Sequence, residues 1–308
     1  MITALVLAAC SHASQLSSSA ASGPPAEARS TTPGAMTAPV ATPAPFAVQV
    51  TGHGPPMILI PGLASSGDVW TGTVAHVREH FTCHVLTIAG FAGQPRIADP
   101  MLATVRDALA KYITAQKLER PVIVGHSLGG FLALDLAQAH PELVGRLVIV
   151  DSLPFLAAAM NPAATPESMR AAAPAIRKGL QTGSPEARRA QLGGMIPTMV
   201  TAPADQATVL DWGLRSDASA VADWMIEILT RDLRPQLPAI TAPAIVLASW
   251  HGQPGETRDE VSQLYAAQYA ALRGAEIVLA ERARHFIMLD EPDFLYAQLD
   301  RFLARSER

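Results

Sequence analysis

The chain has few cysteines, no cluster of basic residues and no long apolar run, and each shortage excludes a class of protein. Only Cys10 and Cys83 are cysteines among 308 residues, so neither a disulfide framework nor a zinc site built on cysteines is expected. No stretch approaches the ~20 apolar residues that a membrane-spanning helix needs. Lys+Arg number 23 against 27 Asp+Glu, a formal net charge of −4, so nucleic acid is not an expected partner.

Apolar residues are nevertheless abundant. They make up 49% of the chain, and the mean hydropathy is +0.21. Much of this content is alanine, which is typical of a helix-rich globular protein rather than a membrane protein. A chain of this length is therefore expected to form one large α/β core with an insertion.

Residues 1–45 are read as a targeting segment followed by a linker. Residues 11–45 are dominated by Ser, Ala, Thr and Pro and cannot bury enough surface to fold. The preceding Leu7-Ala8-Ala9-Cys10 resembles a bacterial lipobox, which implies export, lipidation of Cys10 and a membrane tether in the cell envelope. The segment lacks the positively charged start of a secretory signal, so an alanine-rich leader of a cytoplasmic protein is the alternative.

From Phe46 onward, short apolar runs alternate with helical periodicity, which predicts a mostly parallel sheet flanked by helices. The continuous apolarity of the runs is typical of strands buried on both faces. We expect strands at 46–50, 57–60, 84–88, 122–124, 147–150, 245–248 and 277–279, and helices at 73–80, 101–116, 128–139, 261–272 and 292–303.

The rhythm of strands stops between residues 152 and 239. This region predicts an inserted helical cap, while 46–151 and 240–308 form the α/β core. Inside the cap, apolar residues recur at helical spacing at positions 221, 224, 225, 228 and 229. Trp212, Trp224, Met225 and Phe155 are the candidates for a substrate-binding wall, although such a stripe can equally pack on the core.

The pentapeptide Gly125-His126-Ser127-Leu128-Gly129 has the pattern G-x-S-x-G between an apolar run and a helix-like stretch. A serine on such a strand-to-helix turn is exposed on a sharp bend, and glycines are needed where a Cβ would collide with neighbouring backbone. Ser127 is therefore the candidate nucleophile. The histidine within the pentapeptide is expected to be a packing residue.

Three motifs together resemble the α/β-hydrolase superfamily over residues 46–303. They are Ile58-Leu59-Ile60-Pro61-Gly62-Leu63, the pentapeptide around Ser127, and Ala283-Arg284-His285-Phe286. The resemblance implies that His285 is the base that accepts the seryl proton. It also implies an oxyanion hole formed by the backbone N–H groups of Leu63 and Leu128.

The acid that orients the histidine has three candidates. Many superfamily members carry it after the strand at 245–248, where this chain has no acid at the usual spacing and offers only Glu256 and Asp259 further on. Both can instead belong to the first turn of the following helix. Some members carry the acid one strand earlier, which is Asp151 here, and this residue is favoured.

These residues predict a hydrolase of carboxylic esters that needs neither metal nor cofactor and acts on small to medium hydrophobic acyl groups. The resemblance to serine members leaves lactonase, thioesterase, amidase, C–C hydrolase and perhydrolase chemistry open. A hydrolase-like protein that binds a ligand without turnover is the alternative from another class. The oligomeric state is not predicted.

Overall fold

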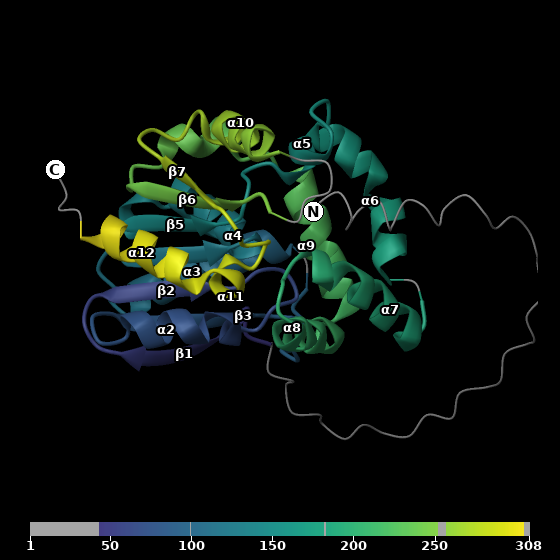
Figure 1. Cartoon of the computed structure of the whole chain (residues 1–308), viewed down its shortest axis with the longest axis horizontal. Coiled ribbons are helices and arrows are strands. Elements are labelled where there is room, and N and C mark those ends of the chain that lie inside the picture. Colours follow the sequence, from purple (N-terminus) through teal and green to yellow (C-terminus); the bar gives the residue numbers. More distant parts are fainter. Residues whose placement is uncertain (1–42, 99, 182, 252–256, 305–308) are drawn as a thin grey trace, which may run out of the picture.

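The computed structural model describes residues 43–98, 100–181, 183–251 and 257–304 (Figure 1). Cys10 and the alternative acid Glu256 lie outside these ranges, so the lipidation of Cys10 and the export that it implies stay predictions. No helix within the described residues combines the length and the apolar character needed to cross a membrane.

The core is a seven-stranded sheet with the order β1-β3-β2-β4-β5-β6-β7. Only β1 runs antiparallel to its neighbour, so the predicted mostly parallel sheet is confirmed. Every strand lies within two residues of its predicted bounds. The strands are β1 (Phe46–Gly52), β2 (Pro56–Ile60), β3 (Thr82–Ile88), β4 (Val122–His126), β5 (Arg146–Val150), β6 (Ala244–Ser249) and β7 (Glu276–Ala280).

The strands are apolar throughout because both faces of the sheet are covered. In β2, Ile58 and Ile60 join one hydrophobic cluster, while Met57 and Leu59 join another on the opposite face. The first cluster includes residues of α3 (Met101–Ala115), α4 (Leu128–Ala139) and α10 (Arg258–Tyr269). The second includes residues of α2 (Thr71–Val77), α11 (Ile287–Asp290) and α12 (Pro292–Leu303). The sheet is therefore the middle layer of three (Figure 1).

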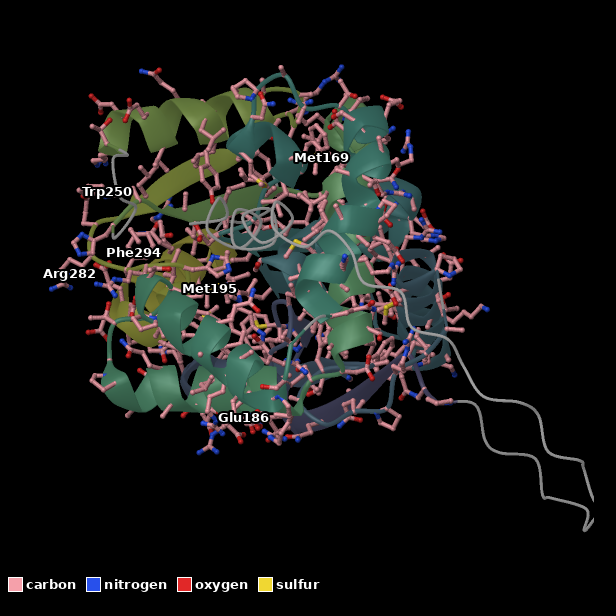
Figure 2. All side chains as sticks on the ribbon, turned by 90° about the vertical axis from the view of Figure 1, so that its right-hand side faces the viewer. Met169, Glu186, Met195, Trp250, Arg282 and Phe294 are labelled. Atoms are coloured by element: carbon pink, nitrogen blue, oxygen red, sulfur yellow. The ribbon has the colours of Figure 1, made fainter. Side chains whose placement is uncertain are left out.

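A helical cap is inserted between β5 and β6, as the sequence predicts. It contains α5 (Leu156–Met160), α6 (Pro166–Gln181), α7 (Pro185–Met195), α8 (Pro203–Arg215) and α9 (Ala218–Thr230), with short 3-10 turns η3 (Ile196–Thr198) and η4 (Arg234–Ala239). The cap helices lie beyond one end of the strands (Figure 1) and in front of the sheet when viewed from that side (Figure 2). The cap thereby covers the edge of the sheet at which Ser127 follows β4.

Two carboxylates, of which Asp135 is fully buried, connect this cap to the core. Glu227 of α9 accepts hydrogen bonds from the backbone N–H groups of Met101 and Leu102 at 2.7 and 2.8 Å, at the start of α3. Asp135 of α4 is fully buried and pairs with Arg231, just after α9, at 2.5 Å. A carboxylate at a helix N-terminus is stabilised by the helix dipole, and a buried carboxylate is stable only when it is paired. Both contacts therefore fix the position of α9 on the core.

Candidate active site

Ser127 occupies a strained turn between β4 and α4. Its φ and ψ are 52° and −118°, and its N–H donates to the Val150 carbonyl at 2.9 Å. A Cβ on Gly125 would lie 2.3 Å from the Gly129 oxygen, and one on Gly129 would lie 2.3 Å from the Ile60 oxygen. Both positions therefore require glycine, and the close approach of strand and helix exposes the serine at the bend.

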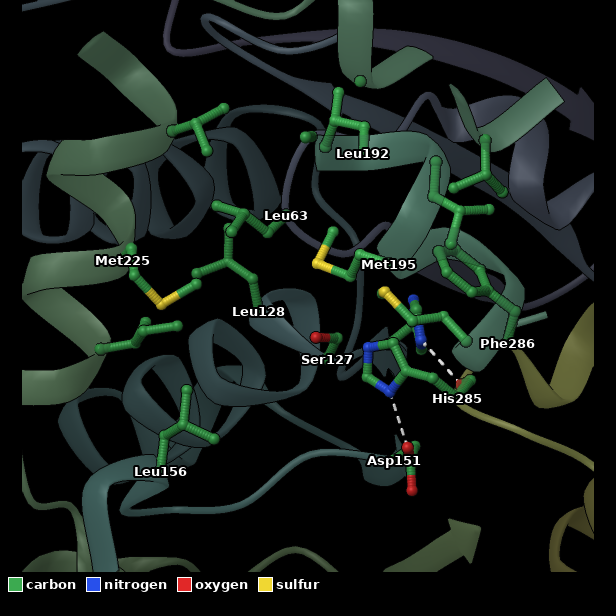
Figure 3. Close-up of a pocket in the computed structure, with 18 of the residues that line it drawn as sticks. Leu63, Ser127, Leu128, Asp151, Leu156, Leu192, Met195, Met225, His285 and Phe286 are labelled. Atoms are coloured by element: carbon green, nitrogen blue, oxygen red, sulfur yellow. Dashed lines mark hydrogen bonds and ion pairs between the residues drawn. The ribbon is translucent and has the colours of Figure 1, made fainter. Parts of the chain in front are cut away.

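The ring of His285 lies between the Ser127 side chain and the carboxylate of Asp151 (Figure 3). His285 Nδ1 is 2.6 Å from Asp151 Oδ2, and both side chains are buried. Within the part of the chain that the structure describes, no hydrogen bond joins the Ser127 hydroxyl to this ring. Such contacts commonly tighten when substrate binds. The three residues follow β4, β5 and β7, so they meet at the carboxyl edge of the sheet.

Asp151 is held by more than the histidine. Its Oδ1 accepts hydrogen bonds from the Ser249 N–H at 2.8 Å and from the Tyr265 hydroxyl at 2.9 Å. Its own N–H donates to the Leu247 carbonyl at 2.7 Å, and its φ is 46°. Donors from β6 and α10 thus converge on one buried carboxylate, which fixes its orientation toward the imidazole.

Within the described ranges, Asp259 makes no hydrogen bond or ion pair with His285. Thr257 and Glu260 form a reciprocal capping box, so α10 begins at Arg258, earlier than predicted, and Asp259 lies exposed in its first turn. Of the three candidate acids, Glu256 is outside the described residues and Asp151 is the one that contacts His285.

Two carboxylates that the sequence analysis did not identify hold the loop of His285. Glu291 Oε2 accepts from the backbone N–H groups of Arg282 and Ala283 at 3.0 and 3.1 Å, and Asp290 Oδ2 accepts from the Arg284 N–H at 2.8 Å. Acidic residues before the proline that starts α12 are an ordinary helix-start pattern, so the sequence carried no signal for this role.

His126 is buried, as expected of a packing residue, and it also contacts the candidate base. Its Nε2 lies 3.0 Å from the backbone carbonyl oxygen of His285, an acceptor, so Nε2 carries the proton. The centroids of the His126 and His285 rings lie 4.5 Å apart. Burial, and then the neighbouring His285, hold the pKa of His126 well below its ordinary value. His126 is therefore a neutral group that ties β4 to the loop of His285.

Leu63 and Leu128 are the residues whose N–H groups the resemblance assigns to the oxyanion hole. Leu128 is the first residue of α4, and N–H groups in the first turn of a helix have no acceptor within the helix. Leu63 follows β2, next in the sheet to β4. Both residues line the same cavity as Ser127 (Figure 3).

This cavity has a volume of about 180 Å³ and lies between the cap and the carboxyl edge of the sheet. Its wall is mainly apolar and includes Leu128, Phe131, Leu192, Met195, Met225 and Phe286. Met225 was a predicted wall residue, and Figure 3 shows its side chain extending toward Leu128 in the cavity wall. An apolar wall beside a serine fits the hydrocarbon part of a ligand.

The other three predicted wall residues are not among the residues that line this cavity. Trp224 is fully buried and its ring centroid lies 6.4 Å from that of Phe91. Trp212 packs in the second hydrophobic cluster, and Phe155 is fully buried beneath Arg234 at 4.9 Å. These large rings fill the junction between cap and core, where their burial stabilises the fold.

Among the described residues, no group of three or more His, Cys, Asp or Glu side chains is placed to hold a metal ion. Cys83 is buried in β3, and burial raises the pKa of its thiol to about 11. A thiol with so high a pKa is not a reactive nucleophile at neutral pH.

Comparisons with known proteins agree with this architecture. Residues 57–298 match the alpha/beta hydrolase family. Among solved structures, an esterase from Exiguobacterium antarcticum superposes with a TM-score of 0.70 at 16% identity, covering 84% of this chain and 96% of that one. The enol-lactonase from Burkholderia xenovorans superposes with a TM-score of 0.68 at 21% identity, covering 84% and 96%. At such identities these similarities establish the fold.

Curated relatives share the sequence over most of the folded part. A pimeloyl-[acyl-carrier protein] methyl ester esterase of Vibrio atlanticus is 28% identical over 213 residues, which span 64% of this chain and 76% of the relative. An uncharacterised protein of Mycobacterium tuberculosis is 26% identical over 284 residues, 85% of this chain and 79% of the relative. With the family match over residues 57–298, the chain belongs to the alpha/beta hydrolase family.

Proposed function

We propose that the protein is a serine hydrolase of carboxylic esters, in which Ser127 is the nucleophile, His285 the general base and Asp151 the orienting acid. The observation that carries the proposal is the position of the His285 ring between Ser127 and a buried carboxylate that its Nδ1 contacts at 2.6 Å. A seryl hydroxyl is a weak nucleophile until a base accepts its proton, and this arrangement supplies one.

The reaction proceeds in two halves. Ser127 Oγ attacks the ester carbonyl carbon while His285 Nε2 takes the seryl proton, and the imidazolium then returns that proton to the leaving alcohol. Water, deprotonated by the same ring, cleaves the acyl-enzyme and restores Ser127. The Leu63 and Leu128 N–H groups stabilise the oxyanion in both halves, worth about 10²–10³ in rate per donor.

The apolar cavity supports small to medium hydrophobic acyl groups. Its volume of about 180 Å³ is slightly larger than a cavity of roughly 150 Å³ that takes up benzene. Relatives whose names denote an esterase or a lactonase act on esters, open or cyclic, and this supports an ester bond as the target.

The test is hydrolysis of p-nitrophenyl esters of increasing acyl length by the wild type and Ser127→Ala. We expect turnover in the wild type with an optimum at short to medium chains, and its loss in the variant. Equal turnover by Ser127→Ala would refute the assigned nucleophile. Activity confined to lactones, amides or C–C bonds would keep the triad and replace the substrate class.

A ligand-binding protein without turnover is the alternative, and it drew its support from the missing acid after β6. The contact between Asp151 and His285 weighs against this alternative, because it offers an acid from the loop after β5 instead. A fluorophosphonate probe discriminates between the two: we expect it to label Ser127 in the folded protein. Failure to label the folded wild type would favour the binding protein.

A further inference from the structure

One face of α7 lines the cavity from Arg188 to the end of the helix at Met195. Arg188, Gln191, Leu192 and Met195 all belong to the cavity wall, and their spacing of three, four and seven residues places them on one side of the helix. The helix runs from the outer rim of the cap near Glu186 inward to Met195 (Figure 2). The cavity wall therefore changes from polar to apolar along α7.

The apolar end of this face lies at the candidate active site. α7 continues into η3, and the Met199 carbonyl just beyond it accepts a hydrogen bond from the Phe286 N–H at 3.1 Å, beside His285. Met195 and Ser127 line the same cavity (Figure 3). At a rise of 1.5 Å per residue, Arg188 is about 10 Å further along the helix axis.

Arg188 is held in place at the polar end. Its Nη2 donates to the carbonyls of Gly213 and Ser216, at 2.9 and 2.7 Å, where α8 ends. These two bonds use only one of the three guanidinium nitrogens, so the N–H groups of Nε and Nη1 can still donate to a further acceptor. The side chain is thus ordered before any ligand arrives.

The charge of Arg188 has no direct counterion within the described part of the chain. The side chain is half-buried, and burial lowers the pKa of its guanidinium, although arginine remains charged at neutral pH. Asp217 acts on it electrostatically from a longer range, while its Oδ1 caps the start of α9 through the Ala220 N–H at 2.8 Å. A partly desolvated cation on the wall of an apolar cavity favours an anion.

We propose that Arg188 and Gln191 form a distal subsite for the anionic end of the substrate, so that the protein prefers esters in which a hydrocarbon chain separates the scissile carbonyl from a carboxylate by about 10 Å. This inference rests on the proposed function, because it places the scissile carbonyl at Ser127 and counts the ~10 Å along α7 from Met195, which lines the cavity together with Ser127. Leu192 and Met195 contact the hydrocarbon chain, Gln191 donates to the carboxylate beside Arg188, and the guanidinium binds it with charge-assisted hydrogen bonds.

The experiment compares ethyl half-esters of linear dicarboxylic acids with ethyl esters of monocarboxylic acids of equal carbon number. The measured quantity is the ratio of kcat/KM for the half-ester to kcat/KM for the neutral ester. Arg188→Gln removes the charge, Arg188→Lys retains it, and Arg189→Gln is the matched control, because Arg189 is the exposed neighbour on α7 and does not line the cavity.

We expect Arg188→Gln to lower the ratio by about tenfold or more, mainly through KM, as for the loss of a hydrogen bond to a charged group. Arg188→Lys should recover part of the ratio, and Arg189→Gln should retain it. An equal loss on both esters, or the same change in Arg189→Gln, would overturn the subsite and leave Arg188 with a structural role at the end of α8.

A second measurement separates this inference from the proposed function. Binding of the half-ester to Ser127→Ala, and to Ser127→Ala with Arg188→Gln, is measured by calorimetry and needs no turnover. Weaker binding in the double variant supports the subsite even if the wild type hydrolyses neither ester, which would contradict only the proposed function. Equal binding in both would overturn the subsite.

Discussion

Asp151 and His285 come from loops that follow β5 and β7, and yet Asp151 Oδ2 lies 2.6 Å from His285 Nδ1. The other carboxylate oxygen, Oδ1, accepts hydrogen bonds from the Ser249 N–H and the Tyr265 hydroxyl, so the carboxylate cannot rotate without losing buried hydrogen bonds. The imidazole is therefore presented to Ser127 by a fixed anionic group.

Replacing this carboxylate should disable turnover. Asp151→Asn preserves the shape but can donate to Nδ1 and favour the wrong tautomer of His285, so we expect kcat to fall by about 10³–10⁴. Asp259→Asn and Glu256→Gln are the matched controls and should retain kcat within a few-fold. Steady-state hydrolysis of the best p-nitrophenyl ester measures all three. A larger loss in either control would reassign the acid.

Tyr265 and Tyr269 offer a comparison between two buried hydroxyls on α10. Tyr265 donates to Asp151 at 2.9 Å, whereas Tyr269 donates to the Ser152 carbonyl at 2.7 Å. Tyr265→Phe removes a hydrogen bond to an ionised group, so we expect kcat to fall by about tenfold. Tyr269→Phe leaves a buried carbonyl unpaired and should mainly lower the free energy of unfolding, by about 1–3 kcal/mol.

Both readouts are needed for this pair, kcat from ester hydrolysis and the free energy of unfolding from urea denaturation. If Tyr265→Phe and Tyr269→Phe lose equal stability and keep equal kcat, the hydroxyl of Tyr265 has no part in orienting Asp151.

Adjacent residues of α9 should respond differently to truncation. Trp224 is fully buried against Phe91, so Trp224→Ala should lower the free energy of unfolding by about 3–5 kcal/mol. Met225 lines the cavity, so Met225→Ala enlarges it and should move the optimum toward longer acyl chains. Urea unfolding and the p-nitrophenyl ester series measure the two effects. An unchanged chain-length profile in Met225→Ala would remove that residue from the acyl site.

The stability of the protein should fall in mild acid because of His126. Burial and the neighbouring His285 hold its pKa well below the ordinary value of 6.5. Below that pH the His126 imidazole is protonated in the unfolded chain but stays neutral in the folded protein. The free energy of unfolding therefore falls as the pH is lowered, by up to about 1.4 kcal/mol per pH unit for one such group.

Urea denaturation between about pH 5 and pH 7.5 tests this dependence. Burial also lowers the pKa of His84, so other groups contribute in the same direction. The informative quantity is consequently the difference between the wild type and His126→Gln, which should show a shallower fall. Parallel curves would mean that His126 is not the titrating group.

The sequence predicted the fold well because its signals are local. Continuous apolar runs such as Ile58 to Ile60 indicate strands that are buried on both faces. These runs predicted the position of every strand in the sheet. α10 began earlier than predicted because the Thr257–Glu260 capping box, rather than the apolar periodicity, sets its first turn. Composition could not identify the cavity wall, because Trp224 and Met225 lie next to each other in the chain and only one of them faces the cavity.

The sequence by itself determined the turn that carries Ser127, the mostly parallel sheet and the place of the cap, since each depends on the order of neighbouring residues. Only the tertiary structure decided which carboxylate meets His285 and which side of α7 faces the cavity. Asp151 after β5, Tyr265 within α10 and His285 after β7 converge from places far apart in the chain. Such contacts depend on how strands align and helices rotate as the core packs, which no local pattern encodes.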